Sequence, residues 1–99
     1  MVKRIVMMDL MPGTEDLFLK IFDSVKTEIR SQRGCLGLEI LRSSNEEGTS
    51  ICTISLWQSI DDIETYRGSS LFQKTWSDVR KLFSSKAMAW TLTSIETML

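Results

Sequence analysis

SLWQSIDDIETYRGSSLFQKTW, residues 55–76, contains the end of a strand, a short helix, a break and the start of a second helix. Ser59 is a favourable N-cap residue and two aspartates follow it in the first turn, so a short helix is predicted to run to about Tyr66. The Gly-Ser-Ser segment at 68–70 interrupts that helix, because these residues favour turns. Beyond the break, apolar side chains recur at helical spacing and predict a second helix. Its apolar stripe consists of Phe72, Trp76, Val79 and Phe83.

Residues 50–57, just before the short helix, alternate in the manner of a strand. One face of this strand would carry Cys52, Ile54 and Leu56. The opposite face would carry Ile51, Thr53, Ser55 and Trp57. Because both faces are largely apolar, the strand is predicted to be covered on both sides.

The N-terminal part of the chain predicts a strand followed by a long amphipathic helix. Residues 3–10 form a strand with apolar residues on both faces, ended by Pro12 and Gly13. Thr14 is the predicted N-cap of a helix that ends near Gly34. The apolar stripe of that helix consists of Leu17, Phe18, Ile21, Phe22, Val25 and Ile29.

Two further strands complete the predicted order of elements. Residues 35–43 form one strand, the polar segment 43–48 forms a hairpin turn, and the alternating residues 87–98 form the last strand. The order β-α-β-β-α-β, with the second helix interrupted, predicts a single α+β domain over residues 1–99. Its fold class is ferredoxin-like βαββαβ, with an antiparallel sheet and helices on one face.

The sheet face without helices needs a cover of its own. With 42% hydrophobic residues, the 99-residue chain carries more apolar material than one small core easily buries. Two copies packed back to back through their open sheet faces would bury this surplus in an isologous homodimer. An ordinary core with some exposed apolar residues is the alternative.

Charge and composition argue against several classes of function. Twelve basic and thirteen acidic residues give a net charge of −1, and the basic stripe that nucleic-acid binding requires is missing. The sequence contains no apolar run of about 18 residues and no signal-peptide pattern, so we expect no membrane segment and a cytoplasmic location. Cys35 and Cys52 form no CxxC pair, and histidine, the commonest metal ligand, is absent. A metal site is therefore not expected.

The segment 55–76 resembles the corresponding part of the antibiotic biosynthesis monooxygenase family. Upstream, PGTEDLFLKIFDSV at 12–25 and GCLGLEILRS at 34–43 are similar to the family's first helix and its glycine-containing second strand. The resemblance implies a dimeric α+β barrel, in which the sheets of two subunits form a barrel and the C-terminal strand reaches the partner. It also implies a pocket between helices and sheet in each subunit.

Within this family, the residues favour cofactor-free oxygenation over haem degradation. The haem-degrading members carry an asparagine, a tryptophan and a histidine where this chain has Val6, Tyr66 and Trp76. All three residues differ, so we expect neither haem nor another cofactor. The predicted function is cofactor-independent monooxygenation of small aromatic substrates of the quinol or polyphenol type. A non-catalytic small-molecule-binding or dimerisation domain of the same fold is the alternative.

Tyr66 and Trp76 are the candidate catalytic residues, because they match pocket positions of the family and offer an O–H and an N–H group. The candidate substrate pocket consists of Val6, Phe18, Phe22, Trp57, Phe72, Phe83 and Trp90. Ordinary core packing is the alternative for these residues. Arg67 is interpreted as a solvated residue at a helix end, with pairing to a substrate phenolate as the alternative. Lys3 and Arg4 are interpreted as a solvated strand edge.

Overall fold

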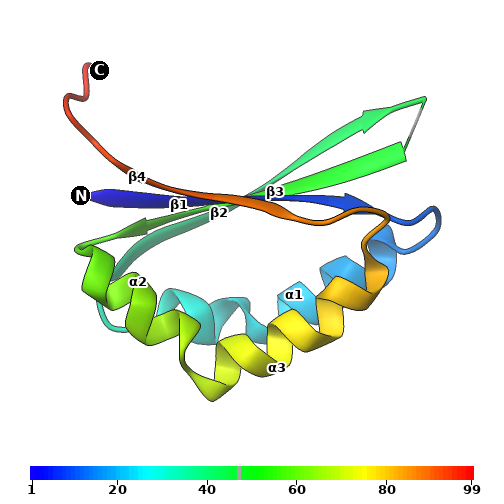
Figure 1. The fold of residues 1–99 in the computed structure, drawn as a ribbon, viewed down its shortest axis with the longest axis horizontal. Coiled ribbons are helices and arrows are strands. Elements are labelled where there is room, and N and C mark those ends of the chain that lie inside the picture. Colours follow the sequence, from blue (N-terminus) through cyan, green and yellow to red (C-terminus); the bar gives the residue numbers. More distant parts are fainter. Residues whose placement is uncertain (47) are drawn as a thin grey trace.

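The computed structural model describes residues 1–46 and 48–99 and has the predicted order of elements (Figure 1). The strands are β1 (Val2–Leu10), β2 (Cys35–Asn45), β3 (Gly48–Trp57) and β4 (Met88–Thr93). The helices are α1 (Glu15–Arg30), α2 (Ile60–Arg67) and α3 (Ser70–Val79), followed by a 3₁₀ turn at Arg80–Leu82. The prediction of a ferredoxin-like βαββαβ fold is confirmed.

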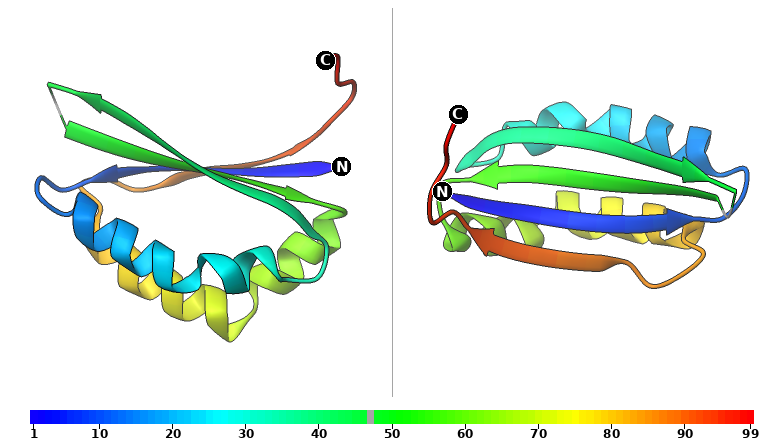
Figure 2. Two further views of the ribbon diagram at one scale, coloured as in Figure 1. Left: turned by 180° about the vertical axis from the view of Figure 1, so that it is seen from behind. Right: turned by 90° about the horizontal axis from the view of Figure 1, so that it is seen from above.

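One four-stranded antiparallel sheet, in the order β2-β3-β1-β4, forms one layer of the domain. The helices lie on one face of this sheet, and Figure 2 shows the sheet from above with the helices behind it. Strands β2 and β3 remain paired up to Asn45 and Gly48, as a hairpin requires. Glu47, in the predicted turn, lies outside the described residues.

Helix α1 forms where the sequence predicts it. Most of its apolar stripe faces the sheet, with Phe18 and Ile29 buried, whereas Leu17 at the edge of the stripe is half exposed. Thr14 occupies the N-cap position, although its hydroxyl donates to the carbonyl of Met11 at 2.7 Å instead of accepting a hydrogen bond from the helix. The burial of the stripe, more than the cap, therefore holds α1 against the sheet.

Gly34 marks the turn before β2 and not the end of α1, which stops earlier, at Arg30. Its φ of +81° lies in the left-handed region that glycine adopts without strain. A Cβ atom at this position would also overlap the side chain of Asp62 on α2. Both the backbone conformation and the close approach of α2 therefore require glycine here.

The predicted Ser59 cap and the predicted break at 68–70 are present, and Ser69 in the break serves as a second cap. The Ser59 hydroxyl accepts a hydrogen bond from the backbone N–H of Asp62 at 3.2 Å. After α2 ends, the Ser69 hydroxyl accepts one from the backbone N–H of Phe72 at 3.2 Å, and α3 begins. Because of the break, the chain changes direction between α2 and α3, and both helices lie against the sheet (Figure 1). One straight helix of the same length would extend away from the sheet surface. Within the described residues, no helix combines the length and apolar character needed to cross a membrane.

The last strand is shorter than predicted. Strand β4 covers Met88–Thr93 instead of 87–98, because Thr93 stands opposite Val2, the first residue of β1. One further backbone hydrogen bond runs from the Ser94 N–H to the Met1 carbonyl at 3.1 Å. The tail then bends away on the side opposite the helices (Figure 1). Its largely exposed apolar residues are Ile95, Met98 and Leu99.

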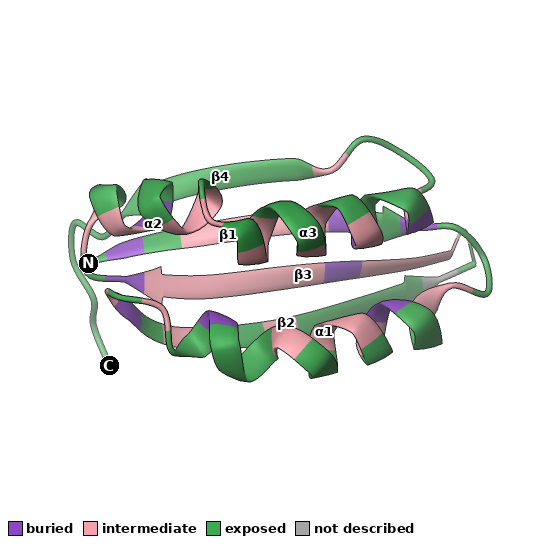
Figure 3. Ribbon diagram, turned by 90° about the horizontal axis from the view of Figure 1, so that it is seen from below, coloured by how far each residue is buried: buried purple, intermediate pink, exposed green. Residues whose placement is uncertain are grey.

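Two clusters of buried apolar residues lie between the helices and the sheet (Figure 3). The larger cluster consists of Met8, Leu10, Phe18, Ile51, Val79 and Leu82. The smaller cluster consists of Val2, Cys35, Trp57 and Ile63. Trp57 is the largest fully buried side chain in either cluster. The free thiols of Cys35 and Cys52 lie on opposite faces of the sheet, so they cannot form a disulfide within one chain.

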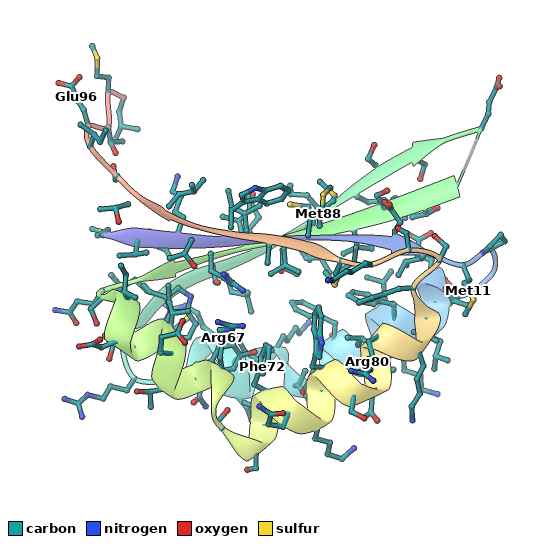
Figure 4. All side chains as sticks on the ribbon, in the orientation of Figure 1. Met11, Arg67, Phe72, Arg80, Met88 and Glu96 are labelled. Atoms are coloured by element: carbon teal, nitrogen blue, oxygen red, sulfur yellow. The ribbon has the colours of Figure 1, made fainter. Side chains whose placement is uncertain are left out.

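The sheet face opposite the helices, called the open face below, is apolar as well. Ile5 of β1 stands opposite Ile54 of β3 and Trp90 of β4, forming a row across three strands. Other apolar residues of the open face are Met7, Leu41, Cys52, Leu56, Met88 and Leu92. Figure 4 shows Met88 on the side away from the helices, and 55% of its surface is exposed. The prediction of apolar side chains on both sides of the strands is confirmed.

Candidate functional site

A cavity of about 420 Å³ lies between the sheet and the helices. Small-molecule sites have volumes of roughly 300–1,000 Å³, so this cavity is large enough for a ligand. The sheet lines it through Val6, Thr53 and Ala89, and α1 lines it through Phe18 and Phe22. Helices α2 and α3 complete the wall with aromatic side chains.

Most of the predicted site residues line this cavity. They are Val6, Phe18, Phe22, Trp57, Tyr66, Phe72 and Trp76. The polar groups of the lining are hydroxyl, indole and guanidinium groups. In the part of the chain that the structure describes, no three His, Cys, Asp or Glu side chains form a group that could hold a metal ion.

Phe83 and Trp90 do not line the cavity, and these two predictions are corrected. Phe83 packs edge-on against Trp76, with ring centroids 5.5 Å apart, and supports the cavity wall from behind. Trp90 lies on the open face, because neighbouring residues of a strand alternate and Ala89 takes the cavity side. In a strand, an assignment displaced by one residue reverses the face of every side chain.

Four aromatic rings form a continuous row along the cavity. Trp57 stacks on Tyr66 with centroids 5.2 Å apart, and Tyr66 meets Phe72 edge-on at 5.3 Å. Phe72 stacks on Trp76 at 5.9 Å, with an angle of 10° between the ring planes. These separations are typical of favourable aromatic pairs, about 4.5–7 Å. The row offers flat apolar surfaces to an aromatic ligand.

Trp57 is a wall of the site and not a free hydrogen-bond donor. Its side chain is fully buried, and Nε1 donates to the hydroxyl of Ser55 at 2.7 Å. An indole has a single N–H donor, and Ser55 occupies this one. Trp57 therefore contributes by holding the ring of Tyr66 in place through stacking.

Burial raises the pKa of Tyr66 to about 12, and the nearby Cys35 sulfur acts in the same direction. Burial has this effect because it disfavours the charged phenolate. At neutral pH the hydroxyl consequently keeps its proton. It can donate a hydrogen bond to an oxyanion that develops in the cavity, but it cannot act as a ready-made base.

The titration of Tyr66 can be measured directly, since it is the only tyrosine in the sequence. We expect its ultraviolet absorbance to change with a midpoint near pH 12 in the folded protein, against about 10 in denaturant. Between these two pH values the unfolded chain loses the phenolic proton while the folded chain keeps it, so stability should fall as pH rises. A folded-state midpoint near 10 would contradict a buried hydroxyl.

Arg4, Arg67 and Thr75 line the cavity too, whereas the sequence interpretation places both arginines in solvent. The side chain of Arg67 does keep 41% of its surface exposed. Arg4 precedes Val6 by two residues in β1, so strand alternation places both on the cavity side. This alternation is the signal that could have identified Arg4. No comparable signal exists for Arg67, because a residue at the end of a short helix can point to solvent or inward.

These features define a class of protein: a ferredoxin-like α+β domain with a cavity lined by aromatic side chains between its helices and its sheet. The family model of antibiotic biosynthesis monooxygenases matches residues 1–76. The chain belongs to the antibiotic biosynthesis monooxygenase family. Among curated protein sequences, no match is found.

Solved structures with the same fold cover nearly the whole chain. Rv0793 of Mycobacterium tuberculosis has a TM-score of 0.85 at 18% identity, with 97% of this chain and 96% of that chain covered. An antibiotic biosynthesis monooxygenase has a TM-score of 0.85 at 14% identity, covering 97% and 100%. SnoaB, a cofactor-independent oxygenase from Streptomyces nogalater, has a TM-score of 0.82 at 15% identity, covering 98% and 95%. At these identities the similarity establishes the shared fold.

Proposed function

We propose that this chain is a cofactor-independent monooxygenase of small aromatic substrates of the quinol or polyphenol type. The observation that carries the proposal is the aromatic row from Trp57 to Trp76 along the cavity between the helices and the sheet. Family membership and the structural similarity to the cofactor-independent oxygenase SnoaB support the same reaction type. The cavity is the proposed substrate site.

In such a reaction the substrate itself supplies the electrons, because an ionised phenol or enol can reduce dioxygen. At a ring carbon that carries two hydrogens, one oxygen atom of dioxygen becomes a carbonyl oxygen. The other oxygen atom leaves as water together with the two hydrogens. Atoms and electrons then balance without an external reductant.

The protein's contribution to this reaction is to exclude water, orient the ring and stabilise negative charge. We assign the orientation to Phe72 and Trp76, whose stacked rings lie along the cavity. We assign charge stabilisation in part to Tyr66, whose protonated hydroxyl is a donor at neutral pH. We assign the exclusion of water to the tryptophan and phenylalanine side chains that line the cavity.

We further propose that the active form is a homodimer built through the open face. Trp90, Met88 and Leu92 are each more than two-fifths exposed on this face, which is unusual for large apolar side chains. The C-terminal tail carries Ile95 and Leu99 and bends toward the same side (Figure 1). A second copy would cover both the open face and the tail. We place the protein in the cytoplasm, a reducing compartment where the thiols of Cys35 and Cys52 would stay free.

Oxygen consumption with a panel of anthrones and quinols tests the proposed activity. We expect uptake above the rate without protein, and Tyr66→Phe should lower kcat by about a hundredfold, since one donor to the developing charge is lost. Leu17→Ala, on the exposed side of α1, serves as the control with unchanged activity. The absence of uptake at saturating substrate would contradict the proposal. A ligand-induced rise in melting temperature without uptake would instead favour a binding domain.

A further inference from the structure

We propose that the cavity binds its aromatic ligand as an anion, with the negatively charged oxygen held between Arg4 and Arg67. The inference rests on the proposed function, because it specifies the substrate class of the same cavity. The shared chemistry is an oxyanion carried by an aromatic ring, either a carboxylate or an ionised phenol.

Arg4 projects toward the helices from β1, one of the two central strands of the sheet. It lies on the cavity side of β1, and its Nη1 donates to the hydroxyl of Thr91 on β4 at 2.8 Å. This bond fixes the guanidinium against the sheet and uses only one of its five N–H donors. Other donors of Arg4 therefore remain for a ligand in the cavity.

Arg67 approaches the same cavity from the last residue of α2. Figure 4 shows Arg67 and Phe72 between the helices and the sheet, and both line the cavity. The Nη1 atom of Arg67 lies 3.3 Å from Oε1 of the Glu64 carboxylate. Its Nε atom is buried and has no hydrogen-bond partner among the described residues. A buried donor without a partner is costly, so an acceptor from a ligand would stabilise it.

The charges around the cavity are unbalanced. Among the described residues that line it, two guanidinium groups are present and no carboxylate. Glu64 pairs with Arg67 from outside the lining, and its side chain is more than half exposed. Burial and then the positive charge of Arg67 lower the pKa of Arg4, whereas Glu64 raises it. The two cations thus repel each other in the free protein, and an anion between them would relieve this repulsion.

Guanidinium groups are suited to this ligand in geometry as well. Two N–H groups of a planar guanidinium can donate one hydrogen bond to each oxygen of a carboxylate, or can both donate to the single oxygen of a phenolate. The hydroxyl of Thr75, on the cavity side of α3, is the second buried polar atom without a partner in the described chain. The aromatic row then takes the apolar ring, and the polar groups take the charged oxygen.

This arrangement also addresses how a substrate could be ionised without histidine. The sequence contains no histidine, and Tyr66 keeps its own proton at neutral pH. Two arginines beside the substrate oxygen would lower the pKa of that oxygen, and the released proton would pass to water. The anionic form is the one that can give electrons to dioxygen. The arginines would thereby replace a general base.

A matched pair of ligands tests the inference. 2-Naphthoate and 2-naphthamide have the same shape and differ in charge, so calorimetric titration of both isolates the contribution of the anion. We expect the wild-type protein to bind naphthoate at least about tenfold more tightly than naphthamide. Arg4→Gln and Arg67→Gln should each remove most of this preference and leave the affinity for naphthamide unchanged. Arg33→Gln, an exposed arginine outside the cavity, is the control.

The absorbance of 4-nitrophenol distinguishes an ionised phenol from a carboxylate. At a pH near its own pKa, binding to the wild-type protein should increase the ionised fraction, and binding to Arg67→Gln should not. If the ionised fraction of 4-nitrophenol increases, the site binds ionised phenols as well as carboxylates. If naphthoate is preferred over naphthamide but the ionised fraction does not increase, the site binds carboxylates only. Circular dichroism checks that each variant is folded. If Arg4→Gln is unfolded, the comparison between the wild-type protein and Arg67→Gln still tests the inference.

Equal affinity for naphthoate and naphthamide, or binding of neither, would overturn the inference. An equal loss of both affinities in the two glutamine variants would overturn it too, because the arginines would then only support the cavity. The proposed function fails separately. Oxygen uptake without any preference for anions would contradict the anion site but not the proposed oxygenase activity. A preference for anions without oxygen uptake would contradict the oxygenase activity but not the anion site.

Discussion

Trp90→Asp is expected to convert the proposed homodimer, with twice the 11.3 kDa chain mass, into monomers. Trp90 lies in the row with Ile5 and Ile54 at the centre of the open face. In an isologous dimer the substitution places two carboxylates in the interface at once. Each buried, unpaired charge costs several kcal/mol, so the dissociation constant should rise by at least roughly a hundredfold.

Sedimentation equilibrium at micromolar concentration measures this change. Leu17→Asp is the matched control, because it introduces the same charge at an exposed apolar position on α1, away from the open face. The control should remain dimeric, and both variants should keep the circular dichroism of the folded protein. A wild-type protein that sediments as a stable 11.3 kDa species would contradict the dimer, as would a Trp90→Asp variant that stays dimeric.

Trp57→Ala is expected to lower the free energy of unfolding by about 3–5 kcal/mol. Trp57 has no exposed surface, stacks on Tyr66 and donates its N–H to Ser55, so the change removes packing and a hydrogen bond together. A small domain has a total stability of about 5–15 kcal/mol, so a large part of it would be lost.

Urea unfolding at a fixed protein concentration measures the loss, since dissociation of a dimer would shift the midpoint. Trp76→Ala is the control: its indole is only half-buried and lines the cavity, so its removal should cost clearly less. A cost below about 1 kcal/mol for Trp57→Ala would contradict its role as the centre of the smaller core cluster.

The order of the elements could be predicted because its determinants are local. Ser59 and Ser69 cap two successive helices, each accepting a hydrogen bond from the backbone N–H three residues later. The Gly-Ser-Ser break between the helices is visible in the sequence. Alternation in β3 placed Trp57 on one face and Ile54 on the other, as observed. Periodicity and capping require no knowledge of distant contacts, so they are readable from one chain.

The details that could not be predicted depend on pairing between distant segments. The end of β4 is set by where β1 begins, so the alternating residues after Thr93 have no strand to pair with. The face of Trp90 depends on the register with Ile5, which the sequence alone does not fix. The inward direction of Arg67 depends on where α2 lies against the sheet. Each of these is a tertiary contact without a local signal.

Mass spectrometry with isotopically labelled dioxygen tests the proposed chemistry most directly. Protein stripped of metal by chelation is incubated with the anthrone or quinol that gives the fastest oxygen uptake. We predict one labelled oxygen atom in each product molecule and the other in water, with the rate lowered in Tyr66→Phe. Product without label, or labelled product formed no faster than in buffer alone, would contradict an oxygenase in this cavity.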